Sequence, residues 1–409
     1  MSLAVLERKQ CARNLALAGN GPAFAAPLHV GRPNVGDRSA LHRRIDAALD
    51  RVWLTNNGPL VQEFEGRLKE LTGVRHCIPV CNATVGLEIA IRALDLSGEV
   101  IVPSFTFIAT AHALQWQRIK PVFCDIAPNS HHIDPSSVEK LITPRTTAIL
   151  GVHLWGQACE VEALGAIARR HRLEVLYDAA HALGCSYGGR MIGTFGRAEV
   201  FSFHATKFVN TFEGGAIATN DDDLAAKIRL MVNFGFAGLD RVVYIGTNGK
   251  MSEISAAMGL TGLDCMEYFT SVNYQNYKHY RGCLSGLPGV TLLAPDSSGK
   301  SNFQYIVLEI DALEAGIHRD DIMAVLHSEN VLARRYFYPG CHRMEPYCSL
   351  DPLASERLQW TERLVNRILI LPTGTAVSTS DIELIATLIR IAVQEPEECR
   401  RLVRAHSKM

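Results

Sequence analysis

Lys207 is the residue of this sequence with the clearest potential for covalent chemistry. It follows the apolar run of residues 200–203 and precedes Gly214 and Gly215, which open a second apolar run. An amine held in such a partly dry place has a lowered pKa and becomes a nucleophile toward aldehydes, with which it forms a Schiff base. The alternative is an ordinary lysine at the edge of a sheet, because most lysines keep their ammonium in water.

A carboxylate and an imidazole follow another apolar segment. Asp178 comes directly after residues 173–177, and His181 lies three residues further on. A carboxylate in that position could keep a pyridine nitrogen protonated, so that the ring accepts the electrons of a carbanion. His181 could contact the same ring. The alternatives are an N-cap role for Asp178 and a structural role for His181.

The remaining candidates could hold a phosphate and the face of a ring. Asn82, Ala83 and Thr84 lie at a strand–turn–helix, where free N–H groups and a hydroxyl favour an anion, although Asn82 or Thr84 could equally be only the N-cap. Ser202 could donate to the phosphate, and Phe107 could stack on the ring or belong to the core. Together these groups match the needs of pyridoxal 5′-phosphate (PLP) and its amine form, PMP, which we therefore expect as cofactor.

The first two thirds of the chain alternate short apolar strands with helices. Such strands imply an α/β fold with a mostly parallel sheet covered on both faces. Ligands of these sheets bind beyond the carboxyl ends of the strands, where Asn82, Phe107, Asp178 and Lys207 fall. The expected strands are residues 77–80, 100–103, 121–125, 147–152 and 173–177, and the expected helices are residues 38–53, 61–72, 87–94, 106–116, 135–141, 161–170, 224–233 and 252–263.

The pattern changes after about residue 266 and predicts a smaller α+β domain. Helices are expected at residues 266–284, 319–329 and 381–393, and strands at residues 290–293 and 303–310. An aromatic loop covers residues 335–347. We expect a tail or arm over residues 1–26, a large PLP-binding domain over 27–265 and a small domain over 266–409.

Composition and charge narrow the class of protein. The 409 residues are 47% hydrophobic, and 41 basic residues nearly balance 42 acidic ones without any block of like charge. We therefore expect neither nucleic acid nor a membrane surface as a partner. No apolar run is long enough to span a bilayer, and no export signal is recognised. Eleven scattered cysteines without zinc-site spacing indicate reduced thiols, a cytoplasmic location and no metal.

Several separate motifs resemble those of the DegT/DnrJ/EryC1/StrS sugar-nucleotide aminotransferases, which are PLP enzymes of the aspartate-aminotransferase fold (fold type I). The resemblance runs from about residue 27 to the last expected helix. It departs at Phe212, where a glycine is usual, and at Ala83, where relatives often have glycine. The matching segments are residues 57–61, 103–110, 152–157, 178–182, 202–207, 213–216 and 248–253.

The resemblance implies roles beyond those suggested by the residues themselves. It assigns ring stacking to Phe107, and it implies a homodimer with shared active sites in which Asn248 reaches the phosphate of the partner's cofactor. The position of His181 is a glutamine in many relatives. Dehydratase relatives carry histidine in place of the lysine, so Lys207 favours amino transfer, with this amine as general base and then general acid.

The resemblance also implies the substrates. Glutamate would give up its amine, and a keto sugar on a nucleoside diphosphate would receive it. Residues 53–61 and 334–342 are most similar to those of enzymes acting on dTDP-4-keto-6-deoxyglucose, which implies a 4-amino-4,6-dideoxy sugar as product. Asn57, Tyr338 and His342 are the expected substrate contacts, with aromatic packing between domains as the alternative for the last two. Amino transfer at C3 and a PLP-binding regulatory or scaffold protein without turnover are the rival interpretations.

Overall fold

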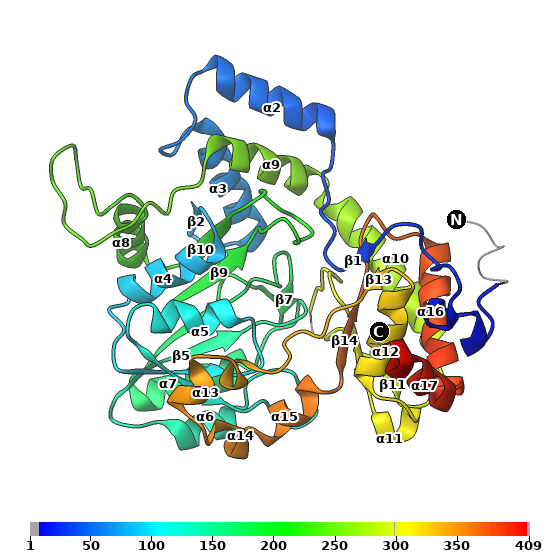
Figure 1. Cartoon of the computed structure of the whole chain (residues 1–409). Helices are drawn as coiled ribbons and strands as arrows, with labels where there is room; N and C mark the ends of the chain where they lie inside the picture. The colour runs from blue at the N-terminus through cyan, green and yellow to red at the C-terminus, as the bar shows by residue number, and fades with distance from the viewer. Residues whose placement is uncertain (1–7, 298, 407–409) are drawn as a thin grey trace.

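A seven-stranded sheet forms the centre of the larger part of the molecule (Figure 1), in a computed structural model that describes residues 8–297 and 299–406. The strand order is β2-β10-β9-β6-β5-β3-β4. Strand β10 runs antiparallel to β2 and β9, and the other neighbouring pairs are parallel. The mostly parallel sheet expected from the sequence is confirmed.

The five strands expected in this sheet are present, and two more flank Lys207. The apolar runs on either side of this lysine form β9 and β10, in addition to the strands expected from the sequence. Asp178 and Ser202 are the last residues of their strands, so both side chains lie at the carboxyl edge of the sheet. The strands are β2 (His76–Val80), β3 (Glu99–Pro103), β4 (Lys120–Cys124), β5 (Thr146–Val152), β6 (Glu174–Asp178), β9 (Ala198–Ser202) and β10 (Gly215–Thr219).

Helices cover both faces of this sheet, as the unalternated apolar strands require. Along β3, Val100 and Val102 face one apolar cluster and Ile101 faces the other. Helix α4 begins at Ala83, four residues earlier than expected, because Asn82 caps it directly after the turn. The helices of this part are α2 (Arg38–Asp50), α3 (Pro59–Thr72), α4 (Ala83–Ala93), α5 (Ile108–Gln115), α6 (Pro135–Leu141), α7 (Val161–His171), α8 (Asp222–Val232) and α9 (Glu253–Asp264).

The C-terminal part contains an antiparallel sheet, β11-β12-β14, packed among helices. Strand β14 and helix α17 were not expected, and β12 begins at Ile306 rather than at Phe303. Its elements are α10 (Met266–Leu284), β11 (Val290–Leu292), β12 (Ile306–Ile310), α11 (Ala312–Ala315), α12 (Arg319–Ser328), β13 (Val331–Leu332), η3 (Cys341–Arg343), α13 (Tyr347–Leu350), α14 (Ala354–Arg357), α15 (Gln359–Val365), β14 (Ile368–Leu371), α16 (Thr379–Gln394) and α17 (Pro396–His406).

The described part of the N-terminal segment lies against the C-terminal helices (Figure 1). Lys9 is 4% exposed, and its ammonium is 3.0 Å from the fully buried Glu329 carboxylate. Glu329 also accepts from the backbone N–H groups of Ala16 (2.7 Å) and Ala23 (2.6 Å). One buried carboxylate therefore fixes three points of this segment. Short elements here and elsewhere are η1 (Ala12–Asn14), η2 (Ala16–Ala18), β1 (Leu28–His29), β7 (Ser186–Tyr187) and β8 (Arg190–Met191).

Three further features concern the described residues as a whole. All eleven cysteines are free thiols. The helices within residues 8–297 and 299–406 include none with the length and apolar character needed to cross a membrane. Over the same residues, no group of three or more His, Cys, Asp or Glu side chains is arranged to hold a metal ion.

Glu329→Gln tests the anchoring of the N-terminal segment. The substitution keeps a hydrogen-bond acceptor but leaves the buried Lys9 ammonium without its counter-charge, so the free energy of unfolding should fall by about 3 kcal/mol. Limited trypsin digestion should then cut more rapidly after the exposed Arg13. The exposed Glu314→Gln is the matched control. Unchanged stability and unchanged cleavage would contradict the anchoring role.

Candidate functional site

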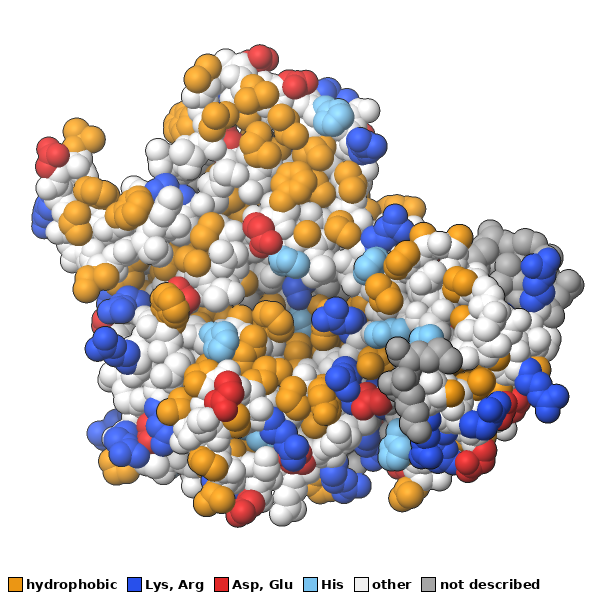
Figure 2. All heavy atoms as spheres, in the orientation of Figure 1, with side chains coloured by type: hydrophobic (Ala, Val, Ile, Leu, Met, Phe, Trp, Pro, Cys, Tyr) orange, Lys and Arg blue, Asp and Glu red, His pale blue; other side chains and the backbone are white. Residues whose placement is uncertain are grey.

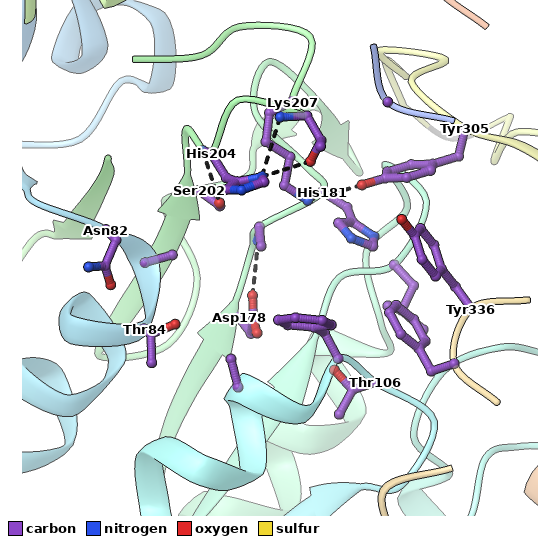
Figure 3. A pocket seen from close by; sticks show the side chains of 18 of the residues that line it. Asn82, Thr84, Thr106, Asp178, His181, Ser202, His204, Lys207, Tyr305 and Tyr336 are labelled. Atoms are coloured by element: carbon purple, nitrogen blue, oxygen red, sulfur yellow. Dashed lines mark hydrogen bonds between the residues drawn. The ribbon is translucent and has the colours of Figure 1, made fainter. Parts of the chain in front are cut away.

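A cavity of about 920 Å³ opens at the carboxyl ends of the parallel strands. Figure 3 shows side chains from several loops and from α4 converging on it. The cavity brings together eight of the residues selected from the sequence, which lie far apart along the chain. They are Asn82, Ala83, Thr84, Phe107, Asp178, His181, Ser202 and Lys207.

Lys207 lies in the loop between β9 and β10, with its side chain among the cavity walls. Its Nζ donates a hydrogen bond to the hydroxyl oxygen of Tyr305 at 3.0 Å. Burial lowers the pKa of this amine to about 8, against the opposing attraction of the Asp178 carboxylate. An amine with this pKa holds an appreciable neutral fraction near pH 7, which a nucleophile or a general base needs.

Asp178 ends β6 and is almost fully buried. Its Oδ2 accepts from the Thr110 hydroxyl at 2.8 Å, and its Oδ1 accepts from the Ala180 N–H at 3.0 Å. Burial raises the pKa of this carboxyl, while the two hydrogen bonds and the Lys207 charge act in the opposite direction. A protonated ring nitrogen placed against it would favour the charged carboxylate, because opposite charges stabilise each other most where water is excluded.

His181 is held as a neutral imidazole. Burial, reinforced by the Lys207 charge, lowers its pKa well below the ordinary value. Its Nδ1 faces the backbone N–H of Trp155 at 3.5 Å, so Nδ1 is the accepting nitrogen and the proton lies on Nε2. The ring also packs 4.4 Å from the Tyr305 ring, measured between centroids. His181 can therefore donate a hydrogen bond from Nε2.

The N-terminus of α4 forms the opposite side of the cavity (Figure 3). Asn82 accepts from the Val85 N–H at 2.9 Å and is the N-cap, which is the structural role considered from the sequence. Ala83 and Thr84 line the cavity at the first helical turn, where N–H groups lack intrahelical partners and attract anions. A Cβ at Gly215 would lie 2.8 Å from the Ala83 nitrogen, so only glycine lets β10 approach this closely.

The donor set fits PLP. The Lys207 amine can bond to an aldehyde, the Asp178 carboxylate can face a pyridine N–H, and the α4 N-terminus with Ser202 can take a phosphate. Phe107 lines the same cavity and is 59% exposed, so an aromatic face is available for a ring.

Four expected site residues do not line this cavity. His342 is buried, and its two ring nitrogens contact the Ser104 hydroxyl (2.6 Å) and the Glu362 carboxylate (2.8 Å). The expectation that His342 contacts the substrate is therefore corrected, because both of its polar atoms are occupied within the protein. The Tyr338 ring packs against two guanidinium groups, those of Arg319 and Arg335. Asn57 and Asn248 are exposed outside the cavity of their own chain.

Several cavity residues were not selected from the sequence. Tyr336 and Phe337 belong to the aromatic loop, so their composition was a usable signal, and Tyr305 lies within the strand predicted at residues 303–310. Residues 29–33 carried no such signal, and Arg334 appeared only as the first residue of the segment 334–342 that resembles those of sugar-nucleotide enzymes. These segments reach the cavity only through packing between parts of the chain that are distant in sequence.

Phe212, the departure from the family motif, has a φ of +62°. A bulky side chain rarely adopts this left-handed conformation, whereas glycine adopts it at no steric cost. The backbone of the lysine loop thus keeps the conformation that a glycine would suit. The Phe212 side chain is exposed and does not line the cavity.

Comparisons with known proteins agree with this geometry. The chain is 35% identical over 364 residues to the dTDP-4-amino-4,6-dideoxy-D-glucose transaminase of Shigella dysenteriae, covering 89% of this chain and 98% of that protein. It is 36% identical over 352 residues to the GDP-perosamine synthase of Caulobacter vibrioides, covering 84% and 93%. The crystal structure of DesI with its TDP-sugar product matches with a TM-score of 0.90 and 49% identity, over 97% of this chain and 99% of that one. The model of the DegT/DnrJ/EryC1/StrS aminotransferase family matches residues 37–390, and the chain belongs to this family.

Proposed function

We propose that this aminotransferase uses PLP to move an amino group from glutamate to C4 of dTDP-4-keto-6-deoxyglucose, giving the 4-amino-4,6-dideoxy sugar. The observation that carries the proposal is the buried Lys207 amine in one cavity with the Asp178 carboxylate. The names of the relatives support the substrate, since one is a dTDP-4-amino-4,6-dideoxy-D-glucose transaminase and DesI was crystallised with a TDP-sugar product.

Each cavity residue has a role in this reaction that follows from its chemistry. PLP, when bound, supplies an electron sink for the substrate carbanion. Lys207 Nζ removes the proton from the carbon that bears the donor's amine and returns a proton to the sugar carbon that receives it. Asp178 would hold the pyridine N–H, and His181 would donate from Nε2 to an oxygen on the ring. Ala83, Thr84 and Ser202 would bind the phosphate, and Phe107 would cover one ring face; all of these residues line the cavity.

The same proposal includes a cytoplasmic homodimer with shared active sites. Figure 2 shows apolar side chains gathered over the region of α2 and α9 and on the loop that projects between α8 and α9. In that loop Leu239 is 95% exposed and Ile245 76%, and Val52 after α2 is 83% exposed. Apolar patches of this kind mark protein interfaces. Asn57 and Asn248 lie outside the cavity of their own chain and are free to reach that of a partner, and free thiols suit the cytoplasm.

A screen of keto-sugar nucleotides tests the substrate. With glutamate and dTDP-4-keto-6-deoxyglucose, NMR of the product should place the new amine at C4. Lys207→Ala should lower the rate by about 10³-fold or more, because the proton-transfer group is lost. Lys140→Ala, which removes an exposed lysine of α6, is the matched control. An amine found at C3 would establish the rival regiochemistry, and no product with any donor would favour a scaffold.

Subunit complementation tests the shared site. Lys207→Ala and Asn248→Asp should each be inactive, the second because a carboxylate repels the phosphate. In a mixed dimer one site regains both native residues, so about half of the activity of a native dimer should return. A mixture of Lys207→Ala with Asp178→Asn is the control, and it should stay inactive because both lesions fall in the same chain's cavity. An equally inactive first mixture would refute sharing through Asn248.

Amine labelling in the cofactor-free protein tests the environment of Lys207. Only the neutral amine reacts, so labelling should be low below pH 8 and rise as the ammonium loses its proton. The midpoint should lie near pH 8, where burial places the pKa of Lys207, rather than near 10.4 as for an ordinary lysine. Peptide mass spectrometry gives the extent of labelling at each pH. A midpoint above pH 10 would show that the amine is not desolvated.

A further inference from the structure

The segment that precedes β12 contacts the loops that follow β6 and β9. Asn302 Nδ2 donates to the carbonyl oxygens of His181 (3.0 Å) and Leu183 (3.2 Å), just after Asp178 ends its strand. Gln304 Nε2 lies 3.5 Å from the carbonyl oxygen of Thr206, the neighbour of the lysine. These contacts link the sheet of the C-terminal part to both loops that carry the proposed chemistry.

Tyr305 completes this link by contacting the lysine itself. Its hydroxyl oxygen accepts from Lys207 Nζ at 3.0 Å (Figure 3). Within residues 8–297 and 299–406, this hydroxyl is the only hydrogen-bond partner of that nitrogen. The Tyr305 ring is fixed in turn, since its centroid lies 4.4 Å from that of His181 and 5.3 Å from that of Trp155.

We propose that Tyr305 is a positioning residue that holds the free amine of Lys207 during amino transfer. The inference deepens the proposed function and rests on it. The reaction requires this amine to be free while it carries protons, and a buried amine without a partner is costly. The Tyr305 hydroxyl satisfies one N–H of the amine and fixes the position of the nitrogen between proton transfers. Because Tyr305 belongs to the segment before β12, the position of the amine depends on how the C-terminal part packs.

The charges around the amine determine in which direction loss of the Tyr305 hydroxyl shifts the pKa of Lys207. Burial raises the pKa of Tyr305 well above its ordinary value, so the phenol is neutral and accepts from the ammonium form. Loss of this acceptor destabilises the ammonium and lowers the pKa of Lys207 further. The other charged or titratable groups that line the cavity are Asp178, His29, His153, His181, His204, Glu213, Arg32, Arg334 and Tyr336.

Tyr305→Phe is the decisive variant, because it removes the hydroxyl and keeps the ring that packs on His181. In the cofactor-free protein, the midpoint of Lys207 labelling should move down by about 1 pH unit. Tyr336→Phe removes a second phenol from the same cavity that has no hydrogen bond to Lys207, and it should leave the midpoint at the wild-type value. A midpoint that does not move in Tyr305→Phe overturns the proposal, as does an equal shift in both variants.

Steady-state kinetics give the second readout. Tyr305→Phe should lower kcat about tenfold while KM for glutamate stays near the wild-type value, because the hydroxyl holds the amine and not the donor. An unchanged kcat contradicts the inference. If wild-type enzyme transfers no amine at all, the proposed function fails instead, and the labelling midpoints still decide the role of Tyr305. Should Tyr305→Phe not fold, Tyr305→Met, which also lacks the acceptor, should show the same downward shift.

Discussion

Desolvation of a single amine is the constraint on which the site depends. Burial in the cavity removes water from the Lys207 ammonium and lowers its pKa to about 8, and the Asp178 carboxylate limits how far that pKa falls. The same burial acts in opposite directions on neighbouring groups, since it raises the pKa of Asp178 and lowers that of His181. One cavity therefore contains an amine with a lowered pKa, a carboxyl with a raised pKa and a neutral imidazole, because each group has different neighbours.

The sheet brings these groups together through its topology. Parallel strands end at a common edge, so Asp178 and Ser202 meet there although 23 residues lie between them in the sequence. Strand β10 reverses direction directly after the lysine loop and packs against the start of α4, which the absence of a side chain at Gly215 allows. This close approach places the Lys207 amine and the α4 N-terminus, which we propose binds the phosphate, on opposite sides of one cavity.

A single chain leaves part of the proposed machinery outside its own cavity. Asn57 and Asn248 lie outside that cavity, and the loop that contains Leu239 presents apolar side chains to solvent. Removing such surface from water stabilises an interface. Within the chain, hydrogen bonds from the segment 302–305 hold the C-terminal part against the loops after β6 and β9. Assembly of the site therefore depends on packing between parts as well as on local sequence.

The sequence by itself determined the local features. Apolar runs of four to six residues predicted five strands of the sheet, the helix expected at residues 87–94 is present although it begins at Ala83, and the motif around Lys207 predicted a reactive amine. Only the tertiary structure decided which distant groups meet. It placed Tyr305 on the Lys207 amine and turned His342 toward Ser104 and Glu362. The physical reason is that spacing along a chain sets the direction of a side chain on its own element, whereas its partners depend on how separate elements pack.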